Sequence, residues 1–154
     1  MITCGIDPGM TGGIAFIDDD GLTVYKMPVY EITKGKSKRK RIDIHKLNEI
    51  MRYHAPDHVT IEQVSAQPGN GSAAAFTYGF GCGVIEAVVQ CGGHPFTYVT
   101  PQRWKKAMQC PKDKDGARMR ASQLFPDHAD KWTRKNQDGL AEAALIALCA
   151  AHNL

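Results

Sequence analysis

The sequence has few of the features expected of a disulfide-stapled, zinc-bound or membrane-embedded protein. Its five cysteines are an odd number, and none stands in a Cys-x-x-Cys spacing, which argues against a disulfide framework and against a zinc site. The pattern shows no N-terminal signal segment and no apolar run long enough to cross a bilayer. We therefore expect a reduced, cytoplasmic protein with no membrane partner.

A strong net charge and internal repeats are also missing. The 154 residues carry a formal net charge of +3, which is too small to indicate a nucleic-acid partner, and no segment recurs. The length predicts a single domain over residues 1–154, and 43% hydrophobic residues suffice for a core. The positive charge is concentrated instead, because residues 34–41 hold six cations in eight positions. Such a run is typical of a solvated loop, and beside an acidic site it would suit contact with phosphates.

Alternating and helical patterns predict an α/β domain. Strands are expected over residues 2–7, 12–18, 22–27, 58–62 and 95–99. Helices are expected over residues 42–53, 72–91, 101–108, 116–124 and 138–151. Exposed loops are expected over residues 28–41 and 67–71. An antiparallel opening followed by strand–helix–strand crossovers predicts a ribonuclease-H-like architecture, with a central mixed five-stranded sheet flanked by helices.

Four acidic residues occupy positions suited to a metal site. Asp7 ends the first predicted strand beside a glycine-rich turn, and Glu62 ends a later buried strand. Asp138 and Glu142 lie four residues apart on the last predicted helix, so they project from one face. Carboxylates crowded in a cleft repel one another, and Mg²⁺, which takes oxygen ligands, resolves that repulsion. Two such ions about 3.5–4 Å apart can promote phosphodiester hydrolysis.

Each acid also has an ordinary structural interpretation. Glu62 could simply end a strand, Asp138 could cap a helix, and Glu142 could be a solvated helix residue. The turn after Asp7 could belong to a plain hairpin. It also resembles the first phosphate loop of sugar kinases and chaperone ATPases. Those proteins need a second such loop, which this sequence lacks, so we expect no nucleotide cofactor.

Four segments resemble, in order along the chain, the RuvC family of Holliday-junction resolvases, in particular its phage-type members. They are Gly5–Gly9, Ile61–Val64, Pro101–Lys106 and Asp138–Ala143. The resemblance covers nearly the whole chain. It implies a homodimer in the cytoplasm of a bacterium or a phage-infected host. The implied activity is an endodeoxyribonuclease that uses Mg²⁺ or Mn²⁺ to cut two strands of a branched DNA, the four-way junction.

The resemblance also implies roles for individual residues. By position, the catalytic metal ligands would be Asp7, Glu62, Asp138 and Glu142. Lys105 and Lys114 fall where the family places lysines near the scissile phosphate. The chain departs from the family pattern in three ways. Glu142 replaces the usual aspartate, its spacing from Asp138 is four where bacterial members commonly show three, and Ser65 stands where they often carry a junction-stacking aromatic.

Several alternatives remain open at the level of sequence. A related nuclease acting on flaps, forks or RNA–DNA hybrids would need the same acids, because the acids determine the reaction and not the shape of the nucleic acid. A non-catalytic protein that binds branched DNA is a further alternative, although it would not need the full set of acids. Trp104 and Trp132 could stack on DNA or anchor helices in the core. The helix over 72–91 could be a dimer interface or a core helix.

Overall fold

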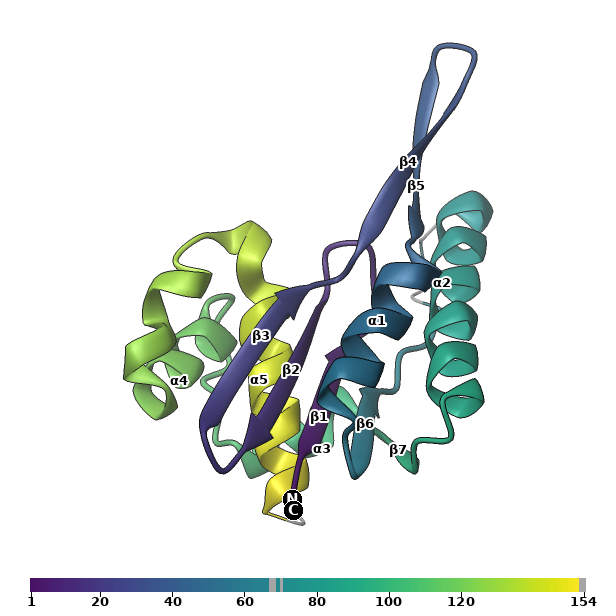
Figure 1. Ribbon diagram of the computed structural model, residues 1–154. Helices are drawn as coiled ribbons and strands as arrows, with labels where there is room; N and C mark the ends of the chain where they lie inside the picture. The colour runs from purple at the N-terminus through teal and green to yellow at the C-terminus, as the bar shows by residue number, and fades with distance from the viewer. Residues whose placement is uncertain (67–68, 70, 153–154) are drawn as a thin grey trace.

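A mixed sheet with β1 at its centre organises the fold (Figure 1). The computed structural model describes residues 1–66, 69 and 71–152. The sheet consists of β1 (Thr3–Asp7), β2 (Gly13–Asp18), β3 (Gly21–Lys26), β6 (His58–Glu62) and β7 (Phe96–Val99). Its strand order is β3-β2-β1-β6-β7, with β1–β2 and β2–β3 antiparallel and β1–β6 and β6–β7 parallel. The expected mixed five-stranded sheet is confirmed.

The helices of the chain are α1 (Ile44–His54), α2 (Ser72–Cys91), α3 (Pro101–Ala107), α4 (Gly116–Leu124) and α5 (Asp138–Ala151). Two 3₁₀ helices that the pattern did not predict, η1 (Pro126–Trp132) and η2 (Lys135–Gln137), connect α4 to α5. Of the loop expected over 67–71, residues 67, 68 and 70 lie outside the described residues.

The alternation of side chains along β1 assigns its two faces. Cys4 and Ile6 join a core cluster that includes residues of α1 and α2. Thr3, Gly5 and Asp7 point the other way, toward α5, where the Thr3 hydroxyl donates to the Ala147 carbonyl at 3.3 Å. The sheet is therefore covered by α1 and α2 on one face and by α5 on the other (Figure 1).

Glycines bring α5 unusually close to the sheet. A Cβ atom on Gly5 would collide with the backbone of Ala143 and Ala147 in α5. A Cβ on Gly13, at the start of β2, would collide with the backbone of Gly139. The first two turns of α5 therefore pack against the backbone beside Asp7, which places the acid-bearing end of this helix at the end of β1.

Residues 29–42 form a hairpin, so the prediction of a loop over 28–41 is wrong, although the segment is exposed as expected. β4 (Val29–Lys34) and β5 (Ser37–Ile42) pair antiparallel as a separate two-stranded sheet. The hairpin projects from the body of the molecule (Figure 1), and residues 30–40 are exposed. The sequence did not predict these strands because neither face of the hairpin is buried along most of its length. The usual alternation of apolar and polar residues is therefore missing.

The length and composition of α2 disagree with the expectation that no apolar run is long enough to cross a membrane. Its 20 residues are long and apolar enough to span a bilayer by length and composition. In the fold, however, Ile85, Val88 and Val89 of α2 belong to the core cluster shared with α1. α2 is thus a helix of the folded domain that also carries an exposed, weakly polar surface.

Candidate metal centre

Three carboxylates meet where β1 and β6 end. Ile6 lies opposite Ile61 in the parallel register, so Asp7 and Glu62 follow at the carboxyl ends of neighbouring strands. α5 adds Glu142 from its second turn. One oxygen of each carboxylate lies within 4.8 Å of the others. The fold therefore unites three of the four acids singled out in the sequence, from segments that are far apart along the chain.

Burial raises the pKa of all three carboxyl groups, and a nearby negative charge raises each of them further. Burial is the largest cause for Asp7, and the charges of Glu142 and Glu62 raise its pKa further, well above the usual value. Burial also dominates the raised pKa values of Glu62 and Glu142, while Lys105 acts in the opposite direction on both. A divalent cation would relieve this repulsion, and an all-oxygen donor set is the kind that Mg²⁺ and Mn²⁺ prefer. These residues therefore fit such an ion.

Two consecutive side chains of α3 support this cluster. The indole Nε1 of Trp104 donates to Glu62 Oε1 at 2.7 Å, and both side chains are buried. Lys105 Nζ lies 3.4 Å from Glu142 Oε1 and 5.1 Å from the centroid of the Trp104 ring. Thr100 caps α3 by accepting from the backbone N–H of Arg103 at 3.3 Å, which fixes where the helix begins.

Asp138 is held differently from the other three acids. Its Oδ1 lies 2.7 Å from Nε of Arg118 in α4. Arg118 also pairs with Asp115 and donates to the Thr133 carbonyl at 2.9 Å. Asp138 is still close enough to raise the pKa of Asp7. The sequence carried no sign of this pair, because Arg118 lies 20 positions before Asp138 in a stretch rich in other charges.

The remaining sequence candidates fall into two groups. Lys114 lies in the exposed segment between α3 and α4, and no described residue forms an ion pair or hydrogen bond with it. Trp104 and Trp132 are buried, and Trp132 donates to the Ser122 hydroxyl at 3.0 Å. Of the two alternatives for the tryptophans, anchoring in the core is confirmed and stacking on DNA is wrong. Trp104 additionally touches the acidic cluster, which the sequence did not reveal.

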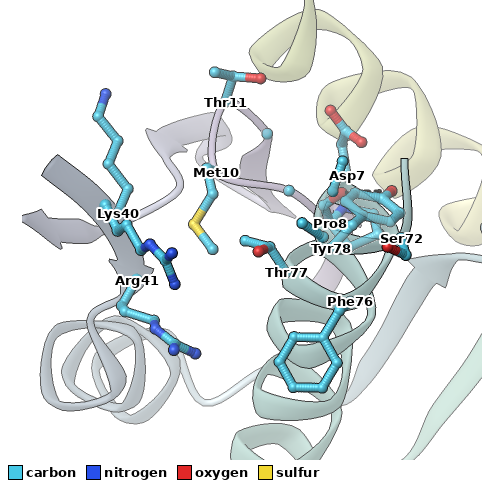
Figure 2. A pocket seen from close by; sticks show the side chains of 15 residues that line it. Asp7, Pro8, Met10, Thr11, Lys40, Arg41, Ser72, Phe76, Thr77 and Tyr78 are labelled. Carbon is cyan, nitrogen blue, oxygen red and sulfur yellow. Dashed lines mark hydrogen bonds between the residues drawn. The ribbon is translucent and has the colours of Figure 1, made fainter. Parts of the chain in front are cut away.

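A cavity of about 1080 Å³ begins at Asp7. The turn that follows β1, the first two turns of α2 and the base of the β4–β5 hairpin line it. Figure 2 shows Asp7 and Tyr78 on one side of this cavity and Lys40 and Arg41 of the hairpin on the other. The Tyr78 hydroxyl donates to the Pro8 carbonyl at 2.9 Å, which ties α2 to the turn beside Asp7. Asp7, one member of the acidic cluster, therefore faces a space bordered by cations.

The raised carboxyl pKa values predict how the metal-free protein responds to pH. Groups whose pKa is raised in the folded state favour folding at pH values below their unfolded pKa, about 4, and this stability is lost as pH rises through the folded pKa. Asp7→Asn, which mimics the protonated acid, should therefore raise the melting temperature at pH 7.5 by at least about 2 °C, with a smaller gain at pH 4.

Thermal unfolding in chelator, followed by circular dichroism, measures this effect. Asp19→Asn is the matched control, because Asp19 is an exposed acid in the turn at the opposite end of β2. It should leave the difference between the two pH values unchanged. A lower melting temperature for Asp7→Asn at pH 7.5 would contradict the repulsion inferred for the cluster.

The sheet order, the acids at the ends of β1 and β6 and the third acid on the closing helix define a ribonuclease-H-like nuclease domain. The family model of the crossover junction endodeoxyribonuclease RuvC matches residues 3–149. The chain belongs to the RuvC family.

Solved structures with the same fold include resolvases from two organisms. The chain is 17% identical to Thermus thermophilus RuvC in complex with a Holliday junction substrate, with a TM-score of 0.67 over 98% of this chain and 92% of that one. A second Thermus thermophilus RuvC structure gives 19% identity and a TM-score of 0.59 over 99% and 97% of the two chains. The yeast mitochondrial Holliday junction resolvase is 14% identical, with a TM-score of 0.56 over 94% of this chain and 76% of that one. No curated protein sequence matches the chain significantly.

Proposed function

We propose that this protein is a divalent-metal-dependent endonuclease that resolves four-way DNA junctions by paired phosphodiester cuts. The observation that carries the proposal is the cluster of Asp7, Glu62 and Glu142 in a chain of the RuvC family. Structural relatives described as Holliday junction resolvases share its fold. A non-catalytic branched-DNA-binding protein would have no use for three crowded carboxylates, one of them buried and two partly buried.

Asp7, Glu62 and Glu142 would hold the ion or ions, Mg²⁺ or Mn²⁺ and two per site. Asp138 would join them only when its pair with Arg118 opens. A bound divalent ion supplies activation of water and stabilisation of negative charge during phosphodiester hydrolysis. In that reaction the water oxygen bonds to phosphorus, the bond from phosphorus to the 3′ oxygen breaks, and the 3′ oxygen takes up a proton. The products carry 5′-phosphate and 3′-hydroxyl ends.

Lys105 and Trp104 contact the acidic cluster and would position its carboxylates and its substrate. Lys105 is half-exposed beside Glu142, so its ammonium can reach a phosphate at the mouth of the cluster and offset charge there. Trp104 is buried and holds one oxygen of Glu62, which leaves the other oxygen available to a ligand. Lys114, in the exposed segment before α4, would act on DNA only from outside this cluster.

The protein would act as a homodimer in the cytoplasm of a bacterium or an infected host, since cutting two strands of one junction requires two such sites. α2 offers the surface for this pairing. Phe76 and Phe80 are 70% and 47% exposed on one side of α2, with ring centroids 6.4 Å apart. Gly83 and Ala87 continue the same exposed stripe at helical spacing, and small residues allow two helices to approach closely.

A comparison of substrates tests the proposed function. Four-way junction, flap, fork, RNA–DNA hybrid and linear duplex of matched sequence are incubated with Mg²⁺, with Mn²⁺ and with chelator. We expect the junction to be cut at least about tenfold faster than any other substrate, a difference of about 1.4 kcal/mol in the barrier, and no cutting in chelator. Preferential cutting of the hybrid or the flap would assign the same chemistry to a different nucleic acid.

A further inference from the structure

The two faces of the β4–β5 hairpin carry different charges. Residues opposite each other across the strands share a face, as do residues two apart along one strand. One face, here called the arginine face, therefore carries Tyr30, Ile32, Lys34, Arg39 and Arg41. The other, here called the lysine face, carries Glu31, Thr33, Lys38 and Lys40.

The arginine face has the stronger unopposed positive charge. It holds three cations and no acid among its residues. On the lysine face, Glu31 lies opposite Lys40 and forms an ion pair with Lys38, with 3.7 Å between Oε2 and Nζ. The net charge is thus +3 on the first face and +1 on the second, counting two lysines and one glutamate there.

The arginine face is turned toward α2 and the cavity. The guanidinium carbon of Arg41 lies 4.4 Å from the centroid of the Phe80 ring, which fixes the base of the hairpin against α2. Arg39, two residues further out on the same face, lines the cavity that begins at Asp7. Lys40 also borders the cavity, but Figure 2 shows Arg41 reaching toward α2 and Lys40 extending in another direction.

Taking the proposed function as its basis, we infer that the arginine face holds the sugar–phosphate backbone of a duplex arm and leads it across the cavity to the three carboxylates. An arginine fork matches the geometry of a phosphate, and among the described residues no acid forms an ion pair with Arg39. Each strand of the hairpin has six residues, or about 20 Å at about 3.4 Å per residue. That length matches about six base pairs of B-DNA.

Matched double variants test this inference. Lys34→Ala with Arg39→Ala removes two cations from the arginine face. Lys38→Ala with Lys40→Ala removes two from the lysine face of the same exposed hairpin. Arg41 stays in both, because it packs on Phe80. Junction binding is measured by fluorescence anisotropy in chelator, where nothing is cut, over a series of KCl concentrations.

The arginine-face variant should bind the junction at least about tenfold more weakly. The negative slope of log K against log [KCl] should become less steep by about 2, since each phosphate contact contributes about 0.9 to its magnitude. The lysine-face variant should change affinity less than about twofold. Arg39→Lys alone should keep the wild-type slope, because the charge remains. Melting temperatures of all variants should agree with wild type, as the positions are exposed.

Equal losses from the two faces, or a larger loss from the lysine face, would overturn this inference and leave the proposed function standing. Light scattering tests whether a second copy of the chain, instead of DNA, contacts the arginine face. If the wild type is a dimer and the arginine-face variant a monomer, that face contacts a second copy of the chain and the inference is wrong. Failure of the wild type to bind junctions or to cut them would overturn the proposed function and the inference together.

Discussion

Asp7→Asn should lower the rate of junction cleavage by about 10³-fold or more, because losing a central metal ligand removes about 4 kcal/mol of charge stabilisation from the reaction. The substituted amide would keep the size of the side chain, and it would weaken the repulsion that burial and two neighbouring glutamates impose on this position. Binding of the junction should therefore stay within about threefold of wild type, or tighten. Single-turnover cleavage of labelled junctions and anisotropy in chelator measure the two quantities.

Asp138→Asn provides the comparison at the same site. Its carboxylate is paired with Arg118 and does not share the close cluster, so we expect a smaller loss, of about tenfold, the size seen when outer partners of a metal ligand are removed. A loss as large as that of Asp7→Asn would show that the Arg118 pair opens and that Asp138 reaches the ion. Cleavage by Asp7→Asn within about tenfold of wild type would overturn the assignment of Asp7 as a ligand.

Trp104→Phe should weaken Mn²⁺ binding by about 10- to 100-fold, although Trp104 does not itself offer a ligand atom. The substitution removes the Nε1–H that donates to Glu62 Oε1 at 2.7 Å and leaves a buried carboxylate oxygen without that partner. Glu62 would then sample other rotamers instead of presenting its second oxygen to the cluster. Calorimetric titration of Mn²⁺ into the metal-free protein measures this effect without any cleavage.

Trp132→Phe is a matched control for that experiment. Trp132 is as buried as Trp104, and its Nε1 also donates a hydrogen bond, to the hydroxyl of Ser122 at 3.0 Å. Both substitutions should therefore lower the melting temperature by a similar amount, while only Trp104→Phe changes the affinity for Mn²⁺. Equal Mn²⁺ affinities for the two variants would contradict the role of Trp104 in positioning Glu62 and leave it a core residue only.

The positions of the three clustered acids followed from local signals. Asp7 and Glu62 end buried strands, and the alternation along parallel neighbours places their side chains on one face. Glu142 follows from the helical pattern of the last segment, and the order of elements was enough to predict a mixed five-stranded sheet flanked by helices. Each of these inferences uses residues within a single strand or helix. There the regular repeat of the backbone fixes the direction in which each side chain points.

The hairpin shows where such reasoning stops. Val29 to Thr33 includes β-branched and aromatic residues that favour a strand, but the charged run from Lys34 to Arg41 dominated the pattern. Strand pairing here is satisfied by cross-strand hydrogen bonds without a buried face, so hydrophobic periodicity has no signal to offer. The separation of an arginine face from a lysine face depends on the register between β4 and β5.

The sequence was thus sufficient for the succession of the main-sheet strands and the helices along the chain, for the three acids that cluster and for the class of chemistry, because these depend on local period and residue type. The indole that holds Glu62 is 42 positions away from it, and the guanidinium that pairs with Asp138 lies on another helix. No local pattern encodes such partners, since they are chosen by the packing of α3, α4 and α5 against one sheet. Folding alone therefore separated three carboxylates that share a site from a fourth that is paired with an arginine.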